Sequence, residues 1–303
     1  MRPSSPPPRR ALPARFRRPR LLIVGCGDVG LRVAAFVSRG VRVMALTSSP
    51  ERLPELRARG ILPLSGNLDR PVDLRRLAGI AQRVLVLAPP PGQGEGDPRT
   101  VALLRALSRA WPPVALVYGS TSGVYGDCAG ALVDETRAPR PTTPRGRRRV
   151  AAETAVRRFG RGGAQTAILR IPGIYAPDRE GGTPRGRLQR GTPTLREQDD
   201  VYTSHIHADD LARACLAALW RGGPGRVFNI CDDTRLKMGD YFDFAADLYG
   251  LPRPPRVDRE TAARELSPMQ MSFMSESRRL DNRRMKQELR LVLRYPTIVE
   301  GLA

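Results

Sequence analysis

The sequence predicts a doubly wound α/β fold, in which helices cover both faces of a parallel sheet. Short, nearly continuous apolar runs recur along the chain and alternate with segments of helical periodicity. Strands that are buried on both faces have this pattern, because neither set of alternating side chains meets water. A glycine-rich turn follows the first run, and long Pro/Gly-rich loops follow later ones, at the end of the sheet where such folds bind ligands.

The predicted elements follow one another in order. The first strand is LLIVG at 21–25, and the helix DVGLRVAAFVSRG after it stops at Gly40. A second strand, VRVMAL, precedes a second helix, PERLPELRARG. Further strands are expected at RVLVLA (83–88), VALVYG (114–119), TAILR (166–170) and RVFNI (226–230).

The same patterns divide the chain into regions. Residues 20–175, with 205–231 completing the sheet, form the predicted sheet domain. Residues 176–204 and 232–303 lose the alternation and are expected to form a smaller, mostly helical lobe over its ligand edge. Residues 1–19 are rich in Arg and Pro and contain no acid, so we expect a disordered tail. A transit peptide is the alternative, although the prolines disfavour the amphipathic helix that it would need.

Composition argues against several classes of protein. The net charge is +21, yet Lys237 and Lys286 are the only lysines among 51 basic residues, and the arginines are spread along the chain. This distribution fits a codon bias better than selection for phosphate contacts, so nucleic acid is not the expected primary partner. No apolar run reaches the ~18 residues of a membrane span, so we expect a soluble protein.

Cysteines and histidines indicate no metal centre. The four cysteines lie far apart without CxxC spacing, which fits a reducing cytoplasm and predicts neither a zinc site nor a disulfide framework. His205 and His207 are the only histidines, and structural roles are expected for both.

The turn GCGDVG, residues 25–30, follows a strand and opens a helix. In this context Gly25 permits the tight turn, Gly27 lets a pyrophosphate approach the backbone, and Gly30 lets helix and strand pack closely. The motif therefore predicts a dinucleotide-binding Rossmann domain, with Cys26, Asp28 and Val29 completing the cofactor loop. The alternative is a glycine-rich turn without a ligand.

The end of the second strand bears on cofactor choice. NAD sites usually place an acid here to hold the ribose 2′-hydroxyl. This chain has Thr47, Ser48 and Ser49, followed by Arg52. These groups can bind a 2′-phosphate, which predicts NADP, with NAD as the alternative. Arg52 could instead simply begin a solvated helix.

From about residue 20 to the C-terminus, the chain resembles the extended short-chain dehydrogenase/reductase superfamily of the NAD-dependent epimerase/dehydratase type, and within it the atypical YeeZ-like proteins. Besides GCGDVG, the stretches that carry the resemblance are GNL (66–68), LAPPPG (87–92), YGSTSGVYGD (118–127), LRIPGIYAPDR (169–179), HIHADDLARA (205–214), FNICDD (228–233), NRRMKQEL (282–289) and LRYPT (293–297). The resemblance adds further cofactor contacts at Asn67, Leu68, Ala88, Pro89, Pro172, Gly173 and Ile174.

The resemblance also places the catalytic groups. In that superfamily a Ser or Thr hydroxyl contacts the substrate, and a tyrosine four residues before a lysine performs acid–base chemistry. Thr121 aligns with the hydroxyl, whereas PTTPRGRRRVAAE (141–153) puts Arg145 on the tyrosine and Arg149 on the lysine. Arginine does not release a proton at neutral pH, so Arg145 cannot replace the phenol, although it can bind an anionic group. Arg149 can keep the cationic role.

Two tyrosines and a histidine bear on the proton donor and on the substrate. Tyr125 is a candidate proton donor, as is Tyr175, although packing is the favoured interpretation of both. His205 stands where the superfamily usually has an arginine, which weakens the expectation of a nucleotide-sugar substrate.

Two hypotheses follow: an NADP-dependent oxidoreductase or epimerase acting on a small molecule, and an inactive NADP(H)-binding sensor. A homodimer through helices like the one near Arg147 is compatible with the sequence but not required.

Overall fold

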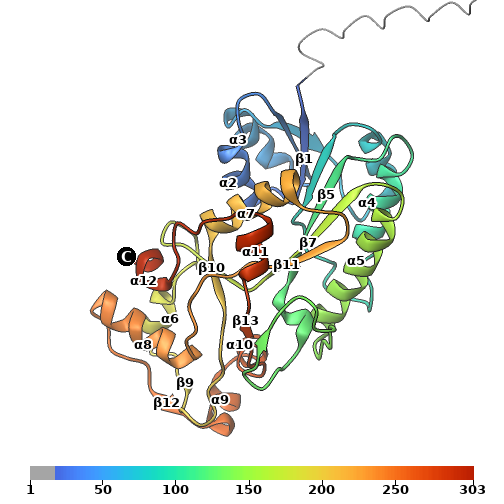
Figure 1. The fold of residues 1–303 in the computed structure, drawn as a ribbon. Coiled ribbons are helices and arrows are strands. Elements are labelled where there is room, and N and C mark those ends of the chain that lie inside the picture. Colours follow the sequence, from blue (N-terminus) through green and yellow to red (C-terminus); the bar gives the residue numbers. More distant parts are fainter. Residues whose placement is uncertain (1–17) are drawn as a thin grey trace, which may run out of the picture.

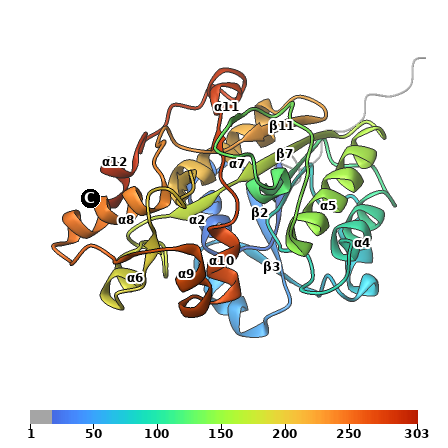
Figure 2. The same cartoon turned by 90° about the horizontal axis from the view of Figure 1, so that it is seen from below.

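The computed structural model describes residues 18–303, and the predicted tail therefore lies almost entirely outside the described residues. Seven parallel strands form the central sheet in the order β11-β7-β5-β4-β1-β2-β3, with helices on both faces (Figures 1 and 2). The predicted doubly wound α/β fold is confirmed. The strands are β1 Arg20–Val24, β2 Arg42–Thr47, β3 Leu62–Ser65, β4 Arg83–Val86, β5 Ala115–Thr121, β7 Gln165–Ile171 and β11 Arg226–Asn229.

The strands are buried on both faces. In β1, Leu21 and Ile23 point to one core, and Leu22 and Val24 point to another. The first core is covered by α2 (Asp28–Phe36), α7 (Ala208–Arg221) and α11 (Arg283–Glu288), and the second by η2 (Pro71–Leu77), α4 (Pro98–Leu107) and α5 (Pro144–Gly160). Because both alternating sets are covered, the middle of the inner strands is mostly apolar, as in β1 (burial of Leu21 to Val24) and β4 (burial of Val84 to Val86).

A smaller set of elements packs beside the carboxyl ends of the strands (Figure 1). It has a core of its own, which includes Leu195, Phe242 and Ile298. Met285 and Leu289, around α11, instead belong to the core of the sheet, so this part of 232–303 differs from the predicted lobe. The packing of these apolar side chains on the sheet decides their place, whatever their position along the chain.

The remaining elements are short, apart from α8. They are η1 Pro50–Arg52, α3 Leu53–Ala58, η3 Ser122–Tyr125, β6 Leu132–Val133, β8 Gly173–Tyr175, α6 Arg185–Gln189, β9 Thr194–Leu195, β10 His205–His207, α8 Met238–Tyr249, β12 Arg256–Val257, α9 Arg259–Glu265, α10 Pro268–Phe273, β13 Arg279–Leu280 and α12 Ile298–Leu302. Three parallel pairs, β10 with β8, β12 with β9 and β13 with β6, join distant parts of the chain.

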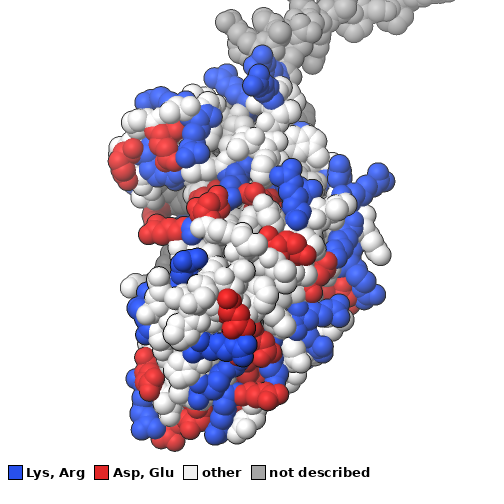
Figure 3. All heavy atoms as spheres, turned by 90° about the vertical axis from the view of Figure 1, so that its left-hand side faces the viewer, with Lys and Arg blue, Asp and Glu red and all other residues white. Residues whose placement is uncertain are grey.

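The arginines are distributed over the surface. Figure 3 shows basic side chains interspersed with acidic ones over one face. Many form ion pairs, such as Arg99 with Asp69 at 2.6 Å and Arg253 with Asp247 at 2.7 Å. Across residues 18–303, no helix is both long enough and apolar enough to cross a bilayer.

Candidate active site

The three fingerprint glycines occupy three different environments. Gly25 has φ +88°, and a Cβ there would lie 2.4 Å from the backbone nitrogen of Ala88. A Cβ on Gly30 would meet the Gly25 carbonyl oxygen at 3.2 Å and Cys26 Sγ at 3.3 Å, so helix and strand touch there. A Cβ on Gly27 would meet nothing within 4 Å, which leaves its backbone open to a ligand. This is the division of roles that a pyrophosphate-binding turn requires.

The N-terminus of α2 points at this turn. Its N-cap is Gly27, which supplies no side-chain cap, so the first N–H groups of the helix are available to an anion. Asp28 lies in the first turn, but Arg32 pairs with it at 3.1 Å and also with Asp178 and Asp209. Arg179 approaches Asp28 from the loop after β8, at 3.7 Å. The carboxylate is thus neutralised where the cofactor loop needs an electropositive surface.

The end of β2 lies beside the same turn. Arg52 Nη1 donates to the carbonyl of Cys26 at 2.7 Å, and its Nη2 lies 3.2 Å from Glu55. The Thr47 hydroxyl accepts from the backbone N–H of Ser49 at 3.1 Å, and Ser48 follows Thr47 directly. The structure therefore brings Thr47, Ser48 and Arg52 to the fingerprint turn.

The loops after β3 and β4 complete this side of the sheet. Asn67 Oδ1 accepts from the backbone of Asp69, and the Ala88 N–H donates to the Val24 carbonyl at 3.0 Å. Arg99, at the start of α4, joins the two loops, because it pairs with Asp69 and donates to the Pro89 carbonyl at 3.3 Å. Arg99 has no motif around it, and sequence reasoning missed it.

A cavity of about 510 Å³ opens at the carboxyl ends of β5 and β7. Thr121 and Arg145 line it, together with Pro172, Gly173 and Ile174, so the structure brings these predicted site residues together. Its outer wall comes from the smaller lobe, through Tyr241 and Phe242 of α8, among others. The cavity thus lies between the cofactor side of the sheet and the lobe.

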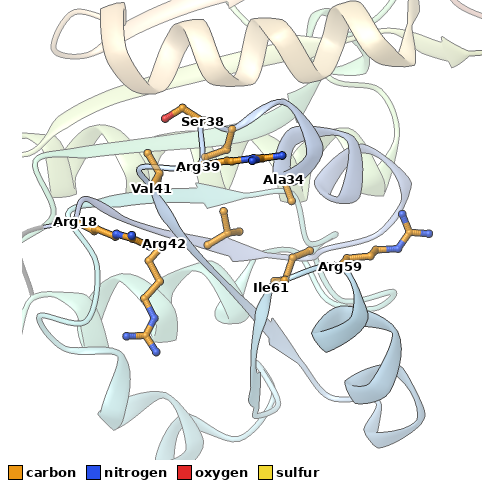
Figure 4. A pocket seen from close by; sticks show the side chains of 11 residues that line it. Arg18, Ala34, Ser38, Arg39, Val41, Arg42, Arg59 and Ile61 are labelled. Carbon is orange, nitrogen blue, oxygen red and sulfur yellow. The ribbon is translucent and has the colours of Figure 1, made fainter. Parts of the chain in front are cut away.

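Another cavity, of about 610 Å³, lies at the opposite end of the sheet (Figure 4). Four arginines line it: Arg18, Arg39, Arg42 and Arg59. It is larger than the cavity at Thr121, but it adjoins the amino end of β2, whereas ligands of parallel α/β sheets bind at the carboxyl ends. The cavity at Thr121 is therefore the candidate active site.

Comparison with known proteins agrees with this geometry. Residues 99–231 match the model of the NAD dependent epimerase/dehydratase family. A conserved protein of unknown function from Silicibacter pomeroyi DSS is 34% identical, with a TM-score of 0.79 over 94% of this chain and 96% of that one. The chain belongs to the NAD-dependent epimerase/dehydratase family. No curated protein matches it by sequence.

Two solved epimerases share the fold of the present chain at lower sequence identity. The UDP-glucose 4-epimerase of Thermotoga maritima, solved with UDP-glucose, is 20% identical with a TM-score of 0.75, over 93% of this chain and 96% of that one. The UDP-glucuronic acid 4-epimerase of Bacillus cereus, solved with NAD, is 19% identical with a TM-score of 0.73 over the same shares.

Arg145 and Arg149, at the positions of the superfamily's tyrosine and lysine, have different surroundings. Arg145 lines the cavity, and its guanidinium has no hydrogen-bond or ion-pair partner within residues 18–303. Desolvation, followed by the charges of Arg149 and Arg148, lowers the pKa of Arg145, but an arginine remains charged at neutral pH. Arg149 is buried and donates to the Gly119 carbonyl at 2.7 Å and the Tyr118 hydroxyl at 3.0 Å. The Arg149 guanidinium thus binds groups of β5 and not a group of the cavity wall.

The two candidate tyrosines also differ. Tyr125 is buried, and its hydroxyl donates to Asn229 Oδ1 at 2.7 Å, which supports the packing interpretation. Burial raises its pKa to about 12. Tyr175 lines the cavity, but its hydroxyl donates to the Thr297 carbonyl at 3.2 Å. Neither phenol is poised to deliver a proton in this structure.

A buried ion pair joins α5 to β7 beside the cavity at Thr121. Glu153 of α5 accepts from Arg170 of β7 through both carboxylate oxygens, at 3.2 and 2.8 Å. It also accepts from Ser120 Oγ at 2.7 Å, directly before Thr121. Sequence reasoning missed this network, because a Glu and an Arg 17 residues apart carry no signal of their contact.

A second ion pair ties the lobe to the cavity. Arg278 lies 2.6 Å from Glu276 and donates to the Gly126 carbonyl at 3.0 Å. Glu276 in turn accepts from the hydroxyl of Thr142 at 2.9 Å, just before α5. These contacts fix the lobe against the start of the helix that carries Arg145.

The two histidines pack against aromatic rings. His205 stacks on Tyr241 at 4.4 Å, and burial lowers its pKa to about 4, so it is neutral at pH 7. His207 lies over Tyr295 at 3.7 Å. All four cysteines are buried and free. In the part of the chain that the structure describes, no group of His, Cys, Asp and Glu could hold a metal ion.

Proposed function

We propose that this chain is an NADP(H)-dependent oxidoreductase or epimerase acting on a small molecule. The observation that carries the proposal is the fingerprint turn, whose three glycines meet the steric requirements of a bound pyrophosphate beside the cavity at Thr121. Family membership and an epimerase neighbour solved with NAD support a nicotinamide dinucleotide as the cofactor.

The residues present fit such a cofactor. The open backbone at Gly27 and the free N–H groups of α2 would hold the pyrophosphate. Thr47, Ser48 and Arg52 would hold a ribose 2′-phosphate, and Pro172, Gly173 and Ile174 would border the nicotinamide. When bound, the nicotinamide supplies a hydride donor or acceptor to the cavity.

The chain's own residues then position and polarise the substrate. The Thr121 hydroxyl can donate to a substrate oxygen, and the Arg145 guanidinium stabilises negative charge on it. Arg145 does not act as the proton donor, because its charge is permanent. Glu153 holds Ser120 and Arg170, which lie one residue before Thr121 and two residues before Pro172.

Cofactor choice is tested by melting the protein with NADPH, NADH, NADP or NAD, because a ligand of the folded state raises the melting temperature. We expect the NADP pair to give the larger shifts. Arg52→Ala should weaken NADPH binding about tenfold more than NADH binding, since a charge-assisted hydrogen bond to the 2′-phosphate is lost, whereas the loss of its contact with the Cys26 carbonyl affects both nucleotides alike. Arg59→Ala is the matched control, because Arg59 also pairs with Glu55. Equal effects of Arg52→Ala on both nucleotides would contradict the 2′-phosphate assignment.

An inactive NADP(H) sensor is the second candidate, and the two arginines at the catalytic positions favour it. We would compare NADPH oxidation with generic aldehydes by the natural protein and by Arg145→Tyr combined with Arg149→Lys. A gain of turnover in the variant supports a natural site that has lost hydride chemistry. No gain fits a natural site that works by another route.

A further inference from the structure

The charged side chains of the cavity at Thr121 do not balance. They are Arg145, Arg179, Arg187, Arg278 and a single acid, Glu276. Glu276 is taken by Arg278 at 2.6 Å, so the other three arginines have no acid of the cavity as a partner. His205 adds no charge, because it is neutral at pH 7.

The uncompensated arginines lie in different walls. Arg145 comes from the start of α5, on the side of Thr121, and has no hydrogen-bond or ion-pair partner among the described residues. Arg187 comes from α6 and lies over the ring of Phe242 at 4.3 Å. Arg179 lies between the cavity and the cofactor turn, where Asp28 partly neutralises it. The cavity therefore has one cation on the reaction side and another at the lobe.

The buried side chain of Arg187 has unpaired hydrogen-bond donors. Its Nε and Nη2 atoms are buried and have no hydrogen-bond partner in residues 18–303. Arg187 forms no ion pair within residues 18–303, and burial together with the nearby charge of Arg190 lowers its pKa. Leaving buried donors unpaired costs stability, and an anion in the cavity would satisfy them.

Neutral polar groups lie in the same cavity wall. The hydroxyl of Thr203 and the Nδ1 atom of His205 are both buried without a partner within the described chain. A hydroxyl group of a ligand can accept from one and donate to the other. These groups suit a polyol rather than a hydrocarbon.

From this arrangement we infer that the cavity takes a compact sugar or polyol derivative with two separate anionic groups, one held by Arg145 and the other by Arg187. Each anionic group is a carboxylate or a phosphate. A nucleotide sugar whose sugar is neutral, such as UDP-glucose, carries its diphosphate between that sugar and the nucleoside, so it places no anion at Arg145. This inference gives the substrate class of the proposed function and rests on it only for the chemistry that follows binding.

The test is calorimetric titration with a graded series, in the presence and absence of NADPH. Glucose carries no charge, gluconate and glucose 6-phosphate carry one anionic group each, and 6-phosphogluconate carries two. We expect the affinity of the ligand to rise with each added anionic group, and we expect 6-phosphogluconate to bind more tightly than UDP-glucose. The two single-anion ligands distinguish a carboxylate subsite from a phosphate subsite.

Variants locate the two subsites. Arg145→Gln and Arg187→Gln should each weaken 6-phosphogluconate about tenfold, to the level of a single-anion ligand, because each removes one charge-assisted contact. Arg187→Lys should recover part of the loss. Arg42→Gln is the matched control, since it removes a charge from the arginine-lined cavity at the other end of the sheet. Melting curves without ligand show which variants are folded.

The inference is overturned if no doubly anionic ligand binds, or if Arg42→Gln weakens binding as much as the two cavity variants. It is also overturned if folded Arg145→Gln and Arg187→Gln proteins bind within twofold of the natural protein. Anion binding without any nucleotide binding would reject the proposed function alone. Nucleotide binding without anion binding would reject this inference alone.

Discussion

The buried ion pair between Glu153 and Arg170 is where a single substitution should have its largest effect. Arg170 is fully buried, and the Glu153 side chain is 3% exposed. In Glu153→Ala, the guanidinium keeps its contact with the ring of Tyr125 at 4.6 Å but loses its only acid. Leaving a buried charge without its partner costs about 3–5 kcal/mol, which is a large part of the ~5–15 kcal/mol that stabilises a typical domain.

The double variant Glu153→Met with Arg170→Met removes both charges and should lose much less stability than Glu153→Ala. Well-packed apolar side chains often replace a buried ion pair at little cost. Asp247→Ala is the control, since Asp247 and Arg253 form a pair whose side chains are 54% and 62% exposed. It should change the free energy of unfolding little, because solvent screens an exposed ion pair.

Urea unfolding, followed by circular dichroism, measures these free energies, and constant m-values show that the transitions are comparable. The reasoning is refuted if Glu153→Ala costs no more than Asp247→Ala. It is also refuted if the double variant loses as much stability as Glu153→Ala. Because Ser120 also donates to Glu153, Glu153→Ala should weaken ligand binding at the neighbouring Thr121 as well.

Two further predictions concern glycines and pH. Gly25→Ala should destabilise the fold by several kcal/mol, because its Cβ would overlap the backbone of Ala88, whereas Gly27→Ala should melt normally but lose nucleotide affinity. Thermal melts with and without NADPH separate the two variants. A normal melt of Gly25→Ala would contradict the steric argument. The pKa of His205 falls from 6.5 to about 4 in the folded state, so its contribution, roughly 3 kcal/mol, is present above pH 6.5 and is lost as pH falls to about 4. Burial raises the pKa of Asp232 to about 7, so the contribution of Asp232 to the free energy of unfolding falls as pH rises, in an overlapping pH range. The measurement is therefore the difference in unfolding free energy between the natural protein and His205→Gln from pH 4 to 7, and a pH-independent difference would reject the prediction.

Much of the sheet could be predicted because its strands are buried on both faces. Their apolar runs are continuous, and GCGDVG identifies the turn between β1 and α2 by local backbone requirements alone. The edge strand β3 was missed. Pro63 interrupts it, and its outer position leaves Leu62 exposed, so its sequence has neither the length nor the pattern of a buried strand.

The sequence by itself determined the doubly wound fold, the family and the order of its motifs, since these depend on neighbours along the chain. Only the tertiary structure decided which arginines of 145–149 face a ligand: Arg145 lines the cavity, while Arg149 bonds to the end of β5. It also brought Arg187 into the same cavity and joined Glu153 to Arg170. Charges act through space, so the role of an arginine depends on which acids the fold places beside it, and sequence separation carries no record of that distance.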